Sequence, residues 1–135
     1  MAHDAIRELV ERVTYAPGYT KAVGTRVESA EAGYVVMSLA RTDNLLQANG
    51  FFHGGVIAGL ADHAAGGAVT AAMPPGRFAV TVNLQVSFLA PAKGGSLIAR
   101  ARALQVGSTI GVARVDVASV ADGAEAAVKV GSISP

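Results

Sequence analysis

The sequence predicts an α+β fold in which a curved antiparallel sheet of about five to six strands wraps around one long apolar helix. The helix is expected from about Gly54 to Met73, a stretch of mostly Ala, Gly, Val, Ile and Leu that ends at Pro74-Pro75-Gly76. A helix that is apolar nearly all round has to be covered on most sides. The flanking segments alternate apolar and polar residues between short turns, which is typical of strands with one buried face. The sheet is therefore the expected cover.

One helix and two strands are predicted before the long helix. Apolar residues recur at helical spacing from Ile6 to Val13, so a helix is expected from about Asp4 to Tyr15, ended by Pro17-Gly18. Two runs with strand composition follow and are separated by the Glu31-Ala32-Gly33 turn. These runs are Lys21–Glu28 and Tyr34–Ala40.

Four further strands are predicted after the long helix. The first is the most regular, because Val80, Val82, Leu84, Val86 and Phe88 alternate with polar residues. Short glycine-containing turns separate the others, as in an antiparallel meander. The four predicted strands are Val80–Phe88, Ser96–Val106, Thr109–Val120 and Ala124–Ser132.

Composition limits the class of protein. The 135 residues fit a single domain, 1–135. The chain is 51% hydrophobic and 16% charged, more apolar than one small core can hide, so an interface with another copy is expected. A formal net charge of +1 with scattered cations makes nucleic acid an improbable partner.

The location is expected to be the cytoplasm, without a membrane span. There is no cysteine, and the N-terminal MAHDAIREL lacks the order of a signal peptide. The stretch from Gly54 to Met73 is long enough to cross a bilayer, but Asp62 and His63 lie near its centre. The three histidines are not spaced as metal ligands, so no metal site is expected.

Asp62 is the most unusual residue of the predicted long helix. Its neighbours at spacings of three and four are Ala58, Gly59, Ala65 and Gly66, which leave room beside the carboxylate. Interior glycines each destabilise a helix by about 1 kcal/mol relative to Ala, so the space is expected to have a use. One interpretation is tight backbone packing with a structural hydrogen bond from Asp62; the other is a reacting carboxylate.

His53-Gly54-Gly55 directly precedes this helix and forms a second candidate feature. A flexible helix entry is the simpler interpretation, but open N–H groups and the helix dipole also suit a developing oxyanion. Gly54 and Asp62 are eight residues apart, about 12 Å along a helix axis. A donor and a base must each lie within about 3 Å of one reacting carbonyl. If both groups act, they must come from different subunits of a dimer.

The segments GFFHGGVIAGLAD and VTVNLQVSFLAPAKGG resemble hotdog-fold acyl-CoA thioesterases of the 4-hydroxybenzoyl-CoA thioesterase superfamily, particularly the PaaI-like branch. The resemblance runs from about Leu45 to the C-terminus. It implies a hotdog fold and hydrolysis of acyl-CoA thioesters to free acid and CoA.

The resemblance also implies roles for individual residues. Asp62 is similar to the carboxylate that attacks the thioester or activates water, and Gly54 to the N–H donor that polarises the carbonyl. The remaining implied catalytic residues are His53, Gln47 and Thr81. The implied substrate-binding residues are Gly55, Asn49, Phe52 and Gly66, with Asn49 as an alternative to Gln47 for the amide role. A related branch has Thr where this chain has Gly66.

As partners, the resemblance implies an acyl-CoA substrate and a homodimer with composite sites, which can pair again into a tetramer. It implies no separate cofactor, since the CoA group enters with the substrate. Arg77, Lys93 and Arg100 are candidates for holding the CoA phosphates, although each also fits a solvated surface charge. Two other functions stay open: a non-catalytic acyl-CoA-binding or sensing module, and a hotdog hydratase or dehydratase.

Overall fold

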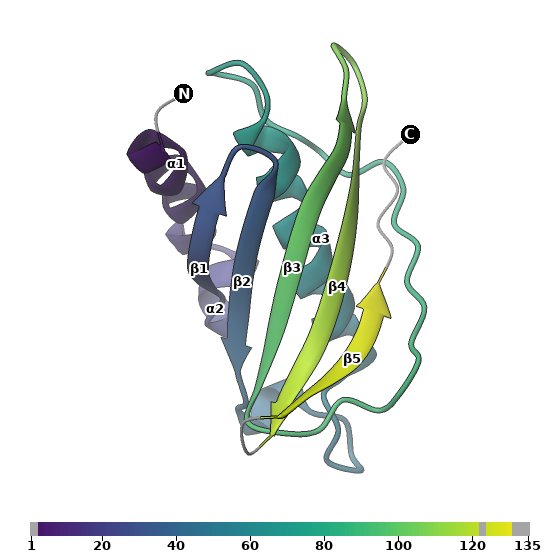
Figure 1. Ribbon diagram of the computed structural model, residues 1–135. Helices are drawn as coiled ribbons and strands as arrows, with labels where there is room; N and C mark the ends of the chain where they lie inside the picture. The colour runs from purple at the N-terminus through teal and green to yellow at the C-terminus, as the bar shows by residue number, and fades with distance from the viewer. Residues whose placement is uncertain (1–2, 122–123, 131–135) are drawn as a thin grey trace.

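A computed structural model describes residues 3–121 and 124–130. The described chain forms a five-stranded antiparallel sheet in the order β1-β2-β3-β4-β5, curved around a central helix (Figure 1). The elements are α1 (His3–Tyr15), α2 (Tyr19–Val23), β1 (Arg26–Glu31), β2 (Tyr34–Ala40), the 3-10 helix η1 (Asp43–Leu45), α3 (Gly54–Ala71), β3 (Ser96–Val106), β4 (Gly111–Ala121) and β5 (Ala124–Val130). The predicted α+β architecture with a wrapped helix is confirmed.

The core lies between α3 and the concave face of the sheet. Ile57, Leu60 and Ala64, which lie on one face of α3, are buried. They face the inward-pointing residues of the strands, among which Val35 and Met37 are fully buried. Small residues on both surfaces let the helix approach the sheet closely. In the part of the chain that the structure describes, no helix is long and apolar enough to cross a membrane.

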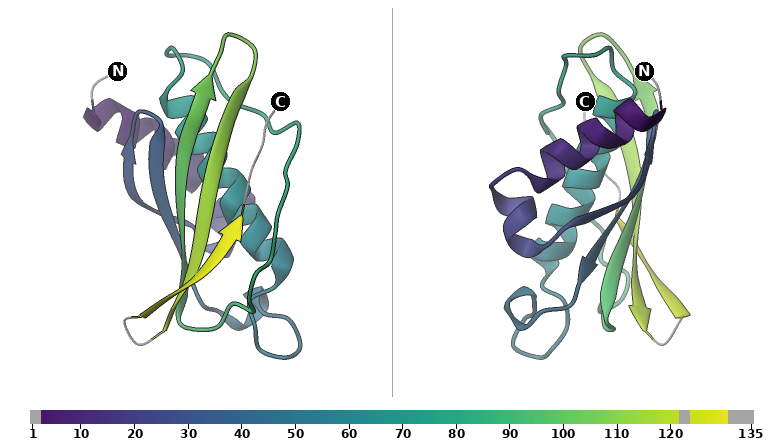
Figure 2. Two further views of the ribbon diagram at one scale, coloured as in Figure 1. Left: turned by 45° about the vertical axis from the view of Figure 1, so that its right-hand side comes forward. Right: turned by 90° about the vertical axis from the view of Figure 1, so that its left-hand side faces the viewer.

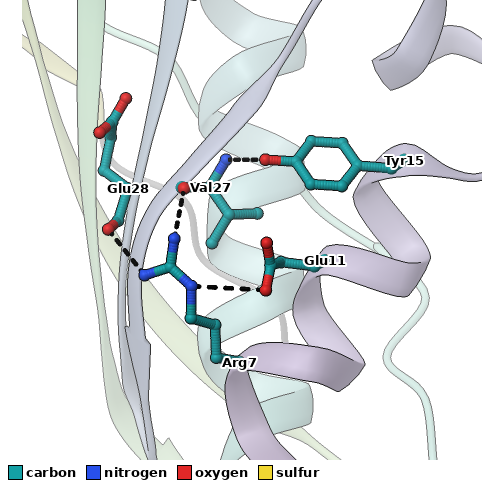
Figure 3. A network of polar contacts seen from close by, with 5 residues as sticks. All are labelled: Arg7, Glu11, Tyr15, Val27 and Glu28. Atoms are coloured by element: carbon teal, nitrogen blue, oxygen red, sulfur yellow. Dashed lines mark hydrogen bonds and ion pairs between the residues drawn. The ribbon is translucent and has the colours of Figure 1, made fainter. Parts of the chain in front are cut away.

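Helix α1 is fixed to the edge strand β1 by polar contacts (Figure 3). The Arg7 guanidinium donates to the carbonyl oxygens of Glu28 at 2.9 Å and Val27 at 3.2 Å, and it lies 3.4 Å from the Glu11 carboxylate. The Val27 N–H donates to the Tyr15 hydroxyl at 2.9 Å. Figure 2 shows α1 crossing the same face of the sheet that carries α3. Helix α1 is therefore held as a fixed wall beside α3.

The strand predicted over Lys21–Glu28 is wrong in its first half. Residues Tyr19–Val23 form helix α2, and β1 begins only at Arg26. Gly24 has a φ of 87° and caps α2 in the left-handed conformation that favours glycine. The Thr20 hydroxyl donates to the Thr14 carbonyl at 2.8 Å, which secures this extra turn against α1.

The strand predicted over Val80–Phe88 does not belong to the five-stranded sheet. Residues 78–89, called here the extended segment, run along the β5 side of the sheet (Figure 1). Val80 and Val82 are 82% and 67% exposed, and no described residue forms a backbone ladder with this stretch. A strand sequence without a neighbour has free N–H and C=O groups that another chain can pair. The strand predicted over Val80–Phe88 is therefore not confirmed in the described chain, because the stretch pairs with no neighbouring strand.

Candidate active site

Asp62 lies on α3 with its carboxylate held by a hydroxyl from the extended segment. The Thr81 hydroxyl donates to Asp62 Oδ1 at 2.5 Å. Two residues before Thr81, a second contact attaches the segment to the helix. There the Ala79 N–H donates to the buried Thr70 hydroxyl at 3.1 Å. Thr81 therefore orients one carboxylate oxygen, and no described residue forms a hydrogen bond with the other, Oδ2.

A cavity of about 140 Å³ opens beside this carboxylate, and we call it the acid cavity. It lies between α1, α3 and the start of the extended segment. Gly66, one turn after Asp62, leaves it open, since a methyl group placed on this glycine would meet no neighbouring atom within 4 Å. Of the four small neighbours expected to leave room beside the acid, Gly66 is the one that lines this cavity. Beside Gly59 the space is filled by Tyr19, whose hydroxyl oxygen would lie 2.6 Å from a methyl carbon placed on that glycine.

His63 forms one side of the acid cavity. Its Nε2 is hydrogen-bonded to the Thr14 hydroxyl at 2.8 Å, and Thr14 is completely buried. Burial lowers the pKa of His63 below its ordinary value of 6.5, and the adjacent Asp62 carboxylate opposes this by a smaller amount. His63 is therefore neutral at neutral pH and joins α3 to α1.

The folded protein is expected to lose stability as the pH falls below 6.5. With its pKa lowered from 6.5 in the fold, His63 binds a proton more readily in the unfolded chain. Its contribution to the free energy of unfolding is therefore complete above pH 6.5 and declines as the pH drops towards the lowered pKa. Thermal unfolding at about pH 7.5 and about pH 5.5 measures this decline. In His63→Gln, which cannot titrate, the decline should be smaller; an equal decline in both proteins would contradict the role of His63.

The start of α3 is the second part of the candidate site. His53 is the N-cap residue, and its Nδ1 accepts a hydrogen bond from the Gly55 N–H at 2.9 Å. The ring thereby occupies the N–H of Gly55, while the N–H of Gly54 makes no hydrogen bond to any other described residue. Together with the positive end of the helix dipole, the Gly54 N–H is suited to stabilise negative charge on an oxygen.

A larger and more open cavity of about 510 Å³ lies at this helix start, and we call it the helix-start cavity. Its lining includes Gln47, Asn49, Phe52 and Gly54 from the predicted site, together with Phe88 of the extended segment. The Phe51 N–H donates to the Asn49 carboxamide at 3.5 Å, so that side chain orders its own loop. Phe52 is only 1% exposed and belongs mainly to the core.

The predicted residues therefore form two groups in one chain. Asp62, Thr81 and Gly66 line the acid cavity, and Gln47, Asn49 and Gly54 line the helix-start cavity. The two cavities have no lining residue in common. This separation agrees with the distance argument from the sequence, in which the acid and the N–H donor of a single chain cannot serve the same carbonyl.

The three cations considered for CoA lie in different parts of the structure. The Arg77 guanidinium donates to the Ser108 carbonyl at 2.8 Å. Arg100 of β3 lies opposite Asp116 of β4 in the backbone pairing of the two strands. The Lys93 ammonium lies 5.0 Å from the centroid of the Phe51 ring, which lines the helix-start cavity. Only Lys93, of these three, is thus placed beside the helix start.

Sequence reasoning missed the part that α1 takes in the site. Leu9, Val13 and Thr14 line the acid cavity, and Thr14 reaches His63 across 49 positions. One signal was present: Thr14 continues the series of apolar positions in α1, and a polar residue in such a series needs a buried partner.

The fold and the site define a class, the hotdog proteins whose central helix carries an acid. Residues 49–126 match the family described as the Thioesterase superfamily, and the chain belongs to it. A Halobacterium salinarum protein with a provisional esterase name is 37% identical over 128 residues, 91% of this chain and 84% of its own. The 1,4-dihydroxy-2-naphthoyl-CoA hydrolase of Listeria monocytogenes is 29% identical over 92 residues, 68% of this chain and 75% of its own.

Solved structures agree with the family. A thioesterase family protein from Silicibacter pomeroyi superposes with a TM-score of 0.86 at 29% identity, covering 93% of this chain and 92% of that one. The PaaI protein of Escherichia coli, from the phenylacetic acid degradation operon, shares the fold with a TM-score of 0.80 at 24% identity, covering 99% and 96%. The resemblance to hotdog thioesterases with a PaaI-like fold is confirmed.

Proposed function

We propose that the protein hydrolyses acyl-CoA thioesters to a free acid and CoA. The observation that carries this proposal is the Asp62 carboxylate, oriented by Thr81 at the edge of a cavity of about 140 Å³ that is lined by both apolar and polar residues. Membership of the Thioesterase superfamily supports thioester hydrolysis, and the similarity to a CoA-thioester hydrolase supports CoA as the leaving thiol.

The active site is proposed to combine two subunits. Asp62 and Thr81 come from one subunit, while the Gly54 N–H and the side chains of His53 and Gln47 come from its partner. The exposed extended segment, whose backbone pairs with no described strand, supports this dimer, because two copies of the segment could pair with each other across the interface. A further pairing into a tetramer is compatible with this arrangement.

Catalysis is proposed to use two groups on opposite sides of the thioester carbonyl. The Gly54 N–H stabilises the negative charge that develops on the carbonyl oxygen. Asp62 either attacks the carbonyl carbon, giving an anhydride that water then hydrolyses, or removes a proton from an attacking water. In both routes the C–S bond breaks and the CoA thiolate takes up a proton, from Asp62 in the water route and from solvent in the anhydride route. His53 keeps the helix start in order by accepting from Gly55.

The CoA portion is proposed to lie along the helix-start cavity of the partner subunit. Lys93 on the Phe51 ring is the candidate for contact with the phosphates. The substrate brings its CoA with it, so no separate cofactor is required, and we expect the reaction in the cytoplasm.

Release of CoA thiol from a panel of aryl-CoA and alkyl-CoA thioesters tests the proposal. Turnover by the wild-type protein is the expected result. Binding of the same thioesters without thiol release would instead support the non-catalytic acyl-CoA-binding module. Formation or loss of an enoyl double bond, without thiol release, would support the hydratase or dehydratase.

A further inference from the structure

We propose that the acid cavity receives the acyl group of the substrate and has room for about six carbon atoms beyond the carbonyl. This inference rests on the proposed thioester hydrolysis for the identity of the reacting group. It goes further by assigning the two ends of the substrate to the two cavities and by naming the residues that set acyl size.

The position of Asp62 decides where the acyl group begins. A carbonyl that Asp62 attacks, directly or through water, lies within a few ångströms of its carboxylate. The first acyl carbon is bonded to that carbonyl and has to occupy the space next to it. The acid cavity is that space, because both Asp62 and Thr81 line it. A neighbouring cavity of about 120 Å³ near Ile110 does not include Asp62 in its lining.

The charges around the two cavities decide which end of the substrate enters the acid cavity. The described lining of the acid cavity contains no Lys or Arg, and its only ionisable side chains are Asp62 and His63. The phosphates of CoA are anions, which an unpaired carboxylate repels and which are costly to remove from water. The helix-start cavity has Lys93 beside its Phe51 wall. The anionic end therefore points to that cavity, and the apolar end enters the acid cavity.

Much of the acid cavity is suited to hydrocarbon, although Thr14, His63 and Thr70 also line it. Leu9, Val10 and Val13 of α1 form one wall, and Met37 of β2 also lines the cavity. An apolar cavity of about 150 Å³ holds one benzene molecule, so a cavity of about 140 Å³ has room for about six carbon atoms. The cavity cannot widen freely, because Arg7 and Tyr15 hold α1 to β1 (Figure 3). The Thr14 hydroxyl, bonded to His63, holds α1 to α3.

Gly66 and Val13 are the residues that set the size of the acyl group that the acid cavity can hold. Gly66 has open space where a side chain would project, so a larger residue there would fill the cavity from the α3 side. Val13 lines the same cavity from α1 and is 42% exposed, which lets a larger residue be accommodated without disturbing the core. Val13 does not line the neighbouring cavity near Ile110, whereas Gly66 lines both.

Equilibrium binding of two non-hydrolysable thioethers, S-ethyl-CoA and S-hexyl-CoA, tests the inference on the intact protein. Wild type should bind S-hexyl-CoA at least about tenfold more tightly than S-ethyl-CoA, since each methylene in a fitted pocket contributes 10-fold or more. Both Gly66→Leu and Val13→Phe should remove most of this preference, and Gly66→Ala should reduce it less. Thermal unfolding of each variant confirms that it folds.

The outcomes separate this inference from the proposed function. An unchanged hexyl preference in Gly66→Leu, or no preference in wild type, overturns the acyl assignment. A hexyl preference that is lost in Gly66→Leu but kept in Val13→Phe also overturns the assignment, because the acyl group would then lie in the cavity near Ile110. Thiol release from hexanoyl-CoA is measured separately, so a protein that binds with the predicted preference but releases no thiol contradicts only the proposed hydrolysis.

Discussion

Replacement of Asp62 by Asn should lower thiol release by at least about 100-fold, since a positioned base or nucleophile contributes about 10² to 10⁴ in rate. The substitution removes the negative charge and the proton-accepting oxygen but keeps the side chain's size. It also keeps an Oδ1 atom that can accept the Thr81 hydroxyl, so the extended segment should stay in place. The steady-state rate constant with the best thioester of the panel is the measurement.

The control for Asp62→Asn is Asp116→Asn. Asp116 is exposed on β4 between the buried residues Val115 and Val117, so its carboxylate points away from α3. This variant loses the same charge and should keep the wild-type rate. Size-exclusion chromatography shows whether each variant remains in the wild-type oligomeric state. If Asp62→Asn retains most of the wild-type activity, Asp62 has no catalytic role and only forms a structural hydrogen bond.

Replacement of Gly54 by Pro should lower the rate constant by about 10² to 10³, the cost of removing one oxyanion donor. Proline lacks the N–H but fits the first position of a helix, which Gly54 occupies. The residue before a proline has to be extended, and His53 already has φ −65° and ψ 137°. The local fold should therefore survive while the proposed donor is lost.

Gly54→Ala is the matched control because it keeps the N–H. Its Cβ would lie 3.4 Å from the Phe88 ring, an ordinary contact distance, so the helix start should be little changed. The alanine variant should retain most of the wild-type rate constant. Equal losses in the alanine and proline variants would assign the effect to crowding of the helix-start cavity rather than to the missing N–H.

The fold could be predicted from the sequence wherever periodicity and turn residues agreed. Strands β2 and β3 have the predicted bounds, and the long helix ends within two residues of its predicted end. Only the first half of the strand predicted over Lys21–Glu28 is wrong, because the short helix α2 between Gly18 and Gly24 carries too little periodicity to be distinguished from a strand. Val80–Phe88 has the alternation of a strand but forms none in the described chain, because alternation indicates a half-buried extended segment and does not specify a hydrogen-bonded neighbour.

The candidate site was predictable where local sequence fixes local geometry. The rise of a helix was enough to separate Gly54 from Asp62, and small residues at helical spacing indicated the space beside the acid. The contacts between Thr14 and His63 and between Thr81 and Asp62 join distant parts of the chain. Such contacts follow from tertiary packing, so the wall that α1 contributes to the acid cavity became apparent only in the structure.

Subunit complementation tests the central claim, that each site takes its acid from one subunit and its N–H donor from the other. Asp62→Asn and Gly54→Pro proteins are unfolded together in equal amounts, refolded and assayed for thiol release. In a mixed dimer, one site carries both defects and the other carries none. About half of randomly formed dimers are mixed, so about a quarter of the wild-type activity should return. Activity no higher than that of the two separate variants, with mixed dimers demonstrated, would contradict a shared site.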